Sequence, residues 1–132
     1  MNQEPRFISH EPLRFEEKEI ISRSKELHHF AEKRRSIREF SDKDIPFEVI
    51  KNVIMTASTA PSGAHKQPWT FCIIRSTELK RKIRIAAEKE EKESYEHRMS
   101  DQWLKDLEPF GTDWRKPFLE TVPWIIVVFK RA

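Results

Sequence analysis

Three arginines and a serine lie within five consecutive residues, in the segment Arg34-Arg35-Ser36-Ile37-Arg38. A guanidinium group presents planar, forked N–H donors that match phosphate oxygens, and a serine hydroxyl adds a further donor. The segment is therefore a candidate phosphate-binding site. The alternative is a solvated basic helix end, where cations interact favourably with the helix dipole. On spacing alone the alternative is favoured, because such clusters are common.

A stiff loop of small residues lies further along the chain, between Ala60 and Trp69. Its glycine and small side chains allow backbone N–H groups to approach a ligand closely. Backbone donors of this kind can hold an anionic oxygen without a bulky side chain. The alternative is an ordinary connection between a helix and a strand. The candidate ligand contacts in this loop are Pro61, Ser62, Gly63 and Ala64.

Glu91 and Tyr95 are four residues apart on a predicted helix and therefore share one of its faces. Together with Lys116 they provide an anion, a phenol and a cation, which is the set needed to hold a zwitterionic amino acid. Taken by themselves, these residues are better explained as a charged surface helix and a solvated lysine. The run Glu88–Arg98, in which both signs are interleaved, is likewise typical of a solvated helix face.

Composition and charge argue against several classes of function. The chain has 132 residues with 25 Lys and Arg against 22 Asp and Glu, and this net charge of +3 gives no indication of a nucleic-acid partner. Its 5 histidines have no metal-binding spacing with cysteine or carboxylate residues, so no metal site is expected. Neither a dinucleotide-binding fingerprint nor a P-loop is present.

The same sequence predicts a soluble, cytoplasmic protein. The single cysteine, Cys72, cannot form an intrachain disulfide, and its apolar neighbours indicate an inert thiol in a buried strand. No apolar run approaches the roughly 20 residues that a membrane-spanning helix needs. The segment Met1–Pro12 also lacks the apolar core of a signal peptide.

Hydrophobic periodicity predicts an α/β or α+β domain, in which helices alternate with strands. Residues 1–14 are expected to form an extended arm, and residues 15–132 a single domain. The predicted elements are helices from Phe15 to the basic cluster at Lys33, Phe47–Ala57, Glu78–Met99 and Gln102–Leu107, a loop at Pro109–Thr112, and strands Trp69–Arg75 and Trp124–Phe129.

Local signals refine these elements. Pro46 is expected in the first turn of the second helix, and Ser76 or Thr77 at the amino-terminal cap of the third. The last strand is almost entirely apolar, which predicts that it is covered on both faces. Because two strands rarely make a stable sheet, we expect an amino-terminal portion, truncated after its second strand, of a domain whose carboxy-terminal half is missing.

Taken together and in this order, the segments resemble the iodotyrosine deiodinases, which belong to the nitroreductase superfamily. The Arg34–Arg38 element is common to nitroreductases, whereas the loop Thr59–Phe71, with its A-P-S-G-A-H-x-x-P-W pattern, is far more particular. The resemblance begins near Phe7 and runs to the chain end. The remaining matches are Pro46-x-x-Val49-Ile50 and, where the deiodinases carry a substrate lid, Glu91-x-x-x-Tyr95 with Trp114-x-Lys116.

This resemblance implies a nitroreductase-like fold, a mixed sheet flanked by helices, in a homodimer with FMN in each of two sites at the subunit interface. Pro61, Ser62 and Gly63 would lie along the flavin. The Ala64 backbone N–H would meet the phenolate oxygen of a halotyrosine. The phosphate and ribityl chain of FMN would be held by the segment Arg34, Arg35, Ser36, Ile37 and Arg38.

The implied activity is reductive dehalogenation of mono- and diiodotyrosine to tyrosine and iodide, with NADPH, directly or through a reductase, as the ultimate electron source. Glu91, Tyr95 and Lys116 would close over the substrate and bind its ammonium and carboxylate groups. No catalytic side chain is assigned, because the donor to flavin N5 would belong to the missing half. Vertebrate relatives carry a membrane anchor, and a corresponding upstream segment would anchor this protein too.

Two other functions stay open on the sequence. One is a general nitroreductase or quinone reductase that uses NAD(P)H and binds flavin without selecting halotyrosine. The other is a truncated, non-catalytic chain that occupies half of a dimer interface. Both flavin hypotheses predict that Arg35 and Ser62 come together in space around a single FMN.

Overall fold

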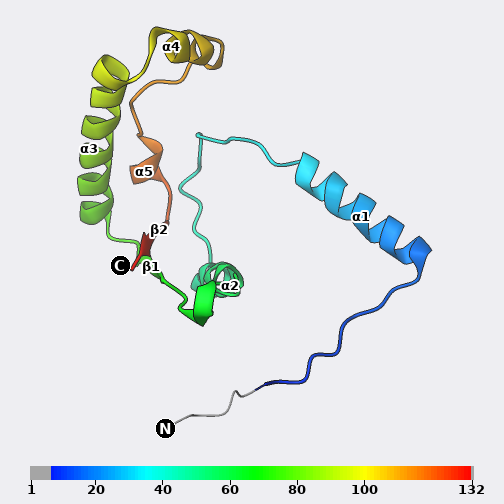
Figure 1. The fold of residues 1–132 in the computed structure, drawn as a ribbon. Coiled ribbons are helices and arrows are strands. Elements are labelled where there is room, and N and C mark those ends of the chain that lie inside the picture. The colour runs from blue at the N-terminus through cyan, green and yellow to red at the C-terminus, as the bar shows by residue number, and fades with distance from the viewer. Residues whose placement is uncertain (1–6, 132) are drawn as a thin grey trace. The chain divides into compact units, whose positions relative to one another are not determined.

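The computed structural model describes residues 7–131, and these fall into two compact units that divide between Ile37 and Arg38. In the first unit the described residues form one helix, α1 (Glu17–Glu32), as predicted (Figure 1). Acidic residues in its first turn and a histidine in its last turn complement the helix dipole. Every residue of α1 is exposed.

The segments that flank α1 have no regular structure. Residues 7–14 form neither helix nor strand, while residues 1–6 of the predicted arm lie outside the described residues. The basic segment Arg34–Ile37 follows a turn at Lys33 and is exposed. Across residues 7–131, no helix combines the length and the apolar character required to cross a bilayer.

The second unit, from Arg38 onward, alternates helices and strands in the predicted order, and the α/β (α+β) class is confirmed. Helix α3 continues into a π-helical turn, η2, and the short elements η1, η3 and α5 are absent from the sequence-based prediction. The elements are α2 (Phe47–Ser58), η1 (Gly63–His65), β1 (Trp69–Ile74), α3 (Thr77–Glu93), η2 (Ser94–Arg98), α4 (Asp101–Leu107), η3 (Glu108–Phe110), α5 (Phe118–Thr121) and β2 (Ile125–Lys130).

Two helices of this unit begin close to the residues that the sequence predicted for their starts. The Ser76 hydroxyl accepts the Leu79 backbone N–H at 3.3 Å, so Ser76 rather than Thr77 caps α3. Pro46 is the residue immediately before α2 rather than a member of its first turn. Its lack of an N–H costs nothing there, because the first N–H groups of a helix have no partner within it.

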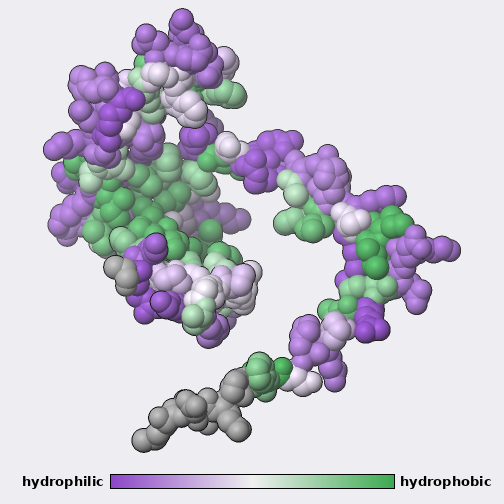
Figure 2. Space-filling view, in the orientation of Figure 1, coloured by the Kyte–Doolittle hydropathy of each residue, from purple (hydrophilic) through white to green (hydrophobic). Residues whose placement is uncertain are grey.

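The two strands pair antiparallel, with Trp69 opposite Lys130 and Ile74 opposite Ile125. Figure 2 shows hydrophobic residues gathered between α3 and these strands, whereas the α4 end of the unit is mostly hydrophilic. Within the described residues the last strand is only partly covered, so its predicted burial on both faces stays a prediction. Its apolar residues Val128 and Phe129 are exposed.

Side-chain contacts fasten the start of α2 to the strands. Trp124, just before β2, donates its indole N–H to the Ile45 carbonyl at 2.9 Å. Arg75, just after β1, lies over the Trp124 ring and pairs with Asp44 at 2.6 Å. Ile50 of α2 is 7% exposed, and no other apolar residue between positions 7 and 131 is as buried. The apolar core is therefore small.

A lysine is buried where α3 and α5 lie side by side (Figure 1). Lys80 is 6% exposed, and its ammonium donates to the backbone carbonyls of Glu120 at 3.2 Å and Val122 at 2.6 Å. A buried ammonium is costly unless acceptors replace its water. The last carbonyls of a helix in turn need donors from outside the helix. Lys80 meets both needs and holds the end of α5 on α3.

Replacing Lys80 with methionine keeps the length of the side chain but removes the donor to Glu120 and Val122. We expect Lys80→Met to lower the free energy of unfolding by roughly 1–3 kcal/mol, the usual cost of an unsatisfied buried polar group. Urea unfolding followed by circular dichroism measures the change. The control is Lys82→Met, because Lys82 is exposed and pairs with Glu78 on the surface; its effect should stay below about 1 kcal/mol. Equal effects would contradict the role given to Lys80.

Candidate functional site

The second unit contains a cavity of about 370 Å³ at the end of α3, bordered by α4 and by the loop that leads into α5. This volume lies within the range typical of sites for small organic ligands. The apolar part of its lining consists of Met99, Trp103, Leu107 and Phe118. The polar part consists of Arg38, Glu91, Tyr95, Thr112, Asp113 and Lys116. Such a lining suits a ligand with an apolar body and a charged end.

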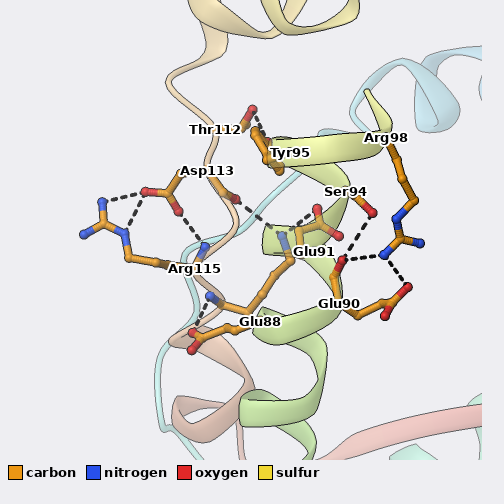
Figure 3. A network of polar contacts seen from close by, with 10 residues as sticks. Glu88, Glu90, Glu91, Ser94, Tyr95, Arg98, Thr112, Asp113 and Arg115 are labelled. Atoms are coloured by element: carbon orange, nitrogen blue, oxygen red, sulfur yellow. Dashed lines mark hydrogen bonds and ion pairs between the residues drawn. The ribbon is translucent and has the colours of Figure 1, made fainter. Parts of the chain in front are cut away.

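The structure brings Glu91, Tyr95 and Lys116 together at this cavity. The Lys116 ammonium lies 3.0 Å from a Glu91 carboxylate oxygen and also donates to the Asp113 carbonyl at 3.4 Å. The side chains of Lys116 and Glu91 are 21% and 37% exposed, so the pair is accessible from solvent. The Tyr95 hydroxyl donates to the Thr112 hydroxyl at 3.4 Å, which makes a weak hydrogen bond. Figure 3 shows Glu91 and Tyr95 facing Thr112 and Asp113 of the loop.

Tyr95 lies in the π-helical turn η2 rather than in a regular helix. The Met99 N–H donates to the Ser94 carbonyl at 2.9 Å, a bond that spans five residues. Arg98 reaches back to Glu90, with which it pairs at 2.7 Å, and thereby closes the turn. Turns of this type are rare and occur frequently at functional sites. The wider turn carries Tyr95 to the cavity wall.

The loop that carries Lys116 is organised by two carboxylates (Figure 3). Asp113 accepts the Arg115 backbone N–H at 2.8 Å and the Arg115 guanidinium at 2.8 and 2.5 Å. These hydrogen bonds, the side-chain ones first, lower the pKa of Asp113. The side-chain hydrogen bond to Asp113 and the charge of Asp113 raise the pKa of Arg115, and the charge of Glu88 adds a smaller contribution. Glu88 of α3 itself accepts the Lys116 backbone N–H at 2.8 Å.

The small-residue loop bends at positions other than its glycine. Left-handed backbone occurs at Ala64, His65 and Gln67, with φ of 50°, 52° and 44°, whereas Gly63 does not have a positive φ. The Ser62 hydroxyl accepts the Gln67 backbone N–H at 2.9 Å and stabilises the bend. A Cβ atom added to Gly63 would meet nothing within 4 Å. Space beside Gly63 is therefore open to a ligand.

The remaining candidate residues differ in whether they line this cavity. The loop residues Pro61 to Ala64 are not among those that line it. The segment Arg34–Ile37 belongs to the first unit, where the Arg35 guanidinium donates to the carbonyls of Glu32 and Arg34. Arg38, in contrast, lines the cavity together with Glu91, Tyr95 and Lys116. In the part of the chain that the structure describes, no group of three or more His, Cys, Asp or Glu residues could hold a metal ion.

The sequence-based reading missed three polar residues of the site, Glu88, Thr112 and Asp113. Glu88 lies three residues before Glu91 and thus on the same helix face, so its spacing could have indicated it. Thr112 and Asp113 have no such signal, because they lie on a loop whose path depends on its contacts with α3.

The sequence profile of the Nitroreductase family matches residues 31–132, which is most of the chain. The chain belongs to the nitroreductase family. The nitroreductase-like fold predicted from the sequence is therefore confirmed.

Iodotyrosine deiodinases are among the nitroreductase-family proteins that this chain resembles. The iodotyrosine deiodinase of Haliscomenobacter hydrossis is 59% identical over 132 residues, which are 100% of this chain and 60% of that protein. Human iodotyrosine deiodinase 1 is 46% identical over 118 residues, which are 89% of this chain and 41% of the human protein. The chain spans about half the length of the curated relatives it matches. The resemblance stated from the motifs is confirmed.

Two solved structures share the fold of this chain. An oxidized iodotyrosine deiodinase bound to FMN and 3-iodo-L-tyrosine has a TM-score of 0.72 and 36% identity, over 79% of this chain and 56% of that one. An FMN-dependent nitroreductase from Clostridium difficile has a TM-score of 0.55 and 22% identity, over 80% of this chain and 44% of that one. The second likeness shows the fold alone.

The lowered pKa of Asp113 predicts a pH dependence of the loop that carries Lys116. This pKa lies lower in the folded than in the unfolded chain, so ionised Asp113 stabilises the folded loop. The stabilisation is fully present at pH values above the ordinary pKa of 3.8 and is lost as the pH falls through the pKa of the folded chain. We expect the Arg115 amide signal in NMR spectra to titrate with a midpoint below 3.8. Asp113→Asn should abolish this titration. A midpoint at or above the ordinary value would contradict the assignment.

Proposed function

We propose that this chain forms part of an FMN-dependent enzyme that removes iodide from iodotyrosines by reduction. The supporting observation is the meeting of Glu91, Tyr95 and Lys116 at one cavity, in a chain similar to iodotyrosine deiodinases. A solved relative binds FMN and 3-iodo-L-tyrosine. In this proposal residues 15–132 belong to the FMN-binding domain, and residues 1–14 form an arm before it.

The charged groups of the cavity suit a zwitterionic amino acid. Glu91 would accept a hydrogen bond from the substrate ammonium, and Lys116 would donate one to the substrate carboxylate. The contacts with the two charges of the ligand would replace the existing ion pair. Partly exposed ion pairs contribute only about 0–1 kcal/mol, so this pair opens at little cost. The two charge-assisted hydrogen bonds gained, each worth about 1.5–3 kcal/mol, exceed that cost.

The apolar lining suits the halogenated ring of the same substrate. Trp103 and Phe118 offer aromatic surface to a ring and its polarizable iodine. The Ala64 backbone N–H is the proposed donor to the phenolate oxygen. An ortho-halogen lowers the pKa of a phenol, so a fixed donor for the anion favours iodotyrosine over tyrosine.

Two segments are the proposed contacts of FMN. Pro61, Ser62 and Gly63 would border the flavin ring, and the open space beside Gly63 fits the approach of a flat group. When bound, FMN supplies the electron pair with which, after uptake of a proton, a carbon–hydrogen bond replaces the carbon–iodine bond and iodide leaves. The phosphate and ribityl oxygens would be held by an exposed segment whose three arginines offer forked guanidinium donors. The segment consists of Arg34, Arg35, Ser36, Ile37 and Arg38.

The proposal extends to the assembly and to the electron source. The protein would be a homodimer with FMN at the subunit interface, and NADPH, directly or through a reductase, would supply electrons for both mono- and diiodotyrosine. Exposed apolar residues of α1, such as Ile20, Leu27 and Phe30, suit burial in a subunit interface.

The purified protein should retain FMN, visible in its absorbance, and should release iodide from diiodotyrosine once the flavin is reduced. Glu91→Gln and Lys116→Gln each remove one charge and should weaken iodotyrosine binding by roughly ten- to a hundredfold, the effect of one charge-assisted hydrogen bond. Quenching of flavin fluorescence measures this affinity. Glu93→Gln is the matched control and should not change it, because Glu93 lies on α3, is exposed and does not line the cavity.

Two results would contradict the proposed function. A protein that binds flavin but releases no iodide would favour a general nitroreductase or quinone reductase. A protein that retains no FMN would favour a non-catalytic chain. Unchanged iodotyrosine affinity in both variants would remove Glu91 and Lys116 from the substrate site.

A further inference from the structure

Glu88 is a half-buried carboxylate on the face of α3 that also carries Glu91. Its side chain is 17% exposed, although carboxylates on helices are mostly solvated. One of its oxygens accepts the Lys116 backbone N–H at 2.8 Å (Figure 3). The Arg84 guanidinium lies 3.9 Å from the same oxygen and 2.8 Å from Glu120. Glu88 therefore connects α3 to the loop at the backbone of Lys116.

Lys116 is thus held by α3 at two points. Glu91 holds its ammonium at 3.0 Å, and Glu88 holds its backbone N–H. A zwitterionic substrate that pairs with both Glu91 and Lys116 must break the first contact. The second contact uses no group that the substrate needs, so it can persist when the substrate is bound.

We propose that Glu88 is a positioning residue for the amino-acid part of the substrate: it keeps Lys116 at the cavity while the Glu91–Lys116 pair opens. This inference rests on the proposed function. Lysine has a long and flexible side chain, and its ordering on binding costs affinity. With its backbone fixed by Glu88, Lys116 needs only to redirect its ammonium from Glu91 to the substrate carboxylate.

A purely structural role for Glu88 is the competing explanation. Lys116 comes just before α5, and its carbonyl accepts the Leu119 N–H at 3.1 Å, so the Glu88 contact also fixes the start of this helix. The two roles affect different ligands. A displaced α5 would alter binding of every ligand of the cavity, since Phe118 lines it. A displaced Lys116 would alter binding only of ligands that carry a carboxylate for it.

The first experiment tests the contact in the protein without ligand. NMR measurement of hydrogen exchange at the Lys116 backbone amide reports its bond to Glu88. We expect Glu88→Ala to remove the protection of this amide and Glu88→Gln to retain most of it, because the glutamine oxygen still accepts an N–H. Glu93→Ala, on the exposed side of α3, should change nothing. Unchanged protection in Glu88→Ala would overturn the inference.

The second experiment compares the affinities of the flavin-loaded protein for iodotyrosine and for iodophenol, which lacks the ammonium and carboxylate groups. Glu88→Ala should weaken iodotyrosine binding by about tenfold, the effect of one lost charge-assisted contact, and leave iodophenol binding unchanged. Glu88→Gln should recover most of the loss. An equal loss for both ligands would overturn the inference in favour of the structural role.

Failure of the proposed function would look different. If the unmodified protein does not bind iodotyrosine, the proposed function is overturned, and the substrate role of Glu88 with it. Unchanged amide exchange or an equal loss for both ligands, in a protein that binds iodotyrosine, overturns the inference about Glu88 alone.

Discussion

The site depends on a polar face of α3 that holds the segment from Asp113 to Val122. The cavity draws its lining from parts of the chain that are far apart in sequence, so it exists only while this face and this segment stay together. The Glu91–Lys116 pair is the contact of this face at the cavity itself. The polar face consists of Lys80, Arg84, Glu88 and Glu91, which recur about one turn apart and bind two backbone carbonyls, the Glu120 carboxylate and both ends of Lys116.

The two ends of this polar face differ in how accessible they are to solvent. Lys80 at one end is 6% exposed, whereas the side chain of Glu91 at the other end is 37% exposed. Breaking the buried end leaves polar groups without partners, which costs several times more than opening a partly exposed ion pair. The buried end thus holds α5 in place, while the accessible end can exchange partners. A site that binds a charged ligand needs both properties, because its scaffold must persist while its ion pair opens.

The sequence predicted the main elements because their signals are local. Apolar periodicity marks α2 and α3, and Ser76 marks where α3 begins. Helix spacing places Glu88 on the face of Glu91, but the contacts of this polar face could not be predicted, since interleaved charges are typical of a solvated helix and the partners lie on a distant loop. Helix α5 has four residues and is too short for any periodicity. Glu91 and Lys116 were identified only through the resemblance, because their spacing alone favours a charged surface.

The loop from Ser62 to Gln67 contains backbone strain that the sequence did not indicate. Non-glycine residues with left-handed backbone cost about 1 kcal/mol or more each, and this loop has three within four positions. Gly63, which would tolerate that conformation, does not adopt it, so the strain is not relieved where relief was available. Strained backbone persists where its surroundings determine it, and it clusters at ligand-binding sites. Its presence at Ala64 therefore favours a ligand-binding loop over an ordinary connection between a helix and a strand.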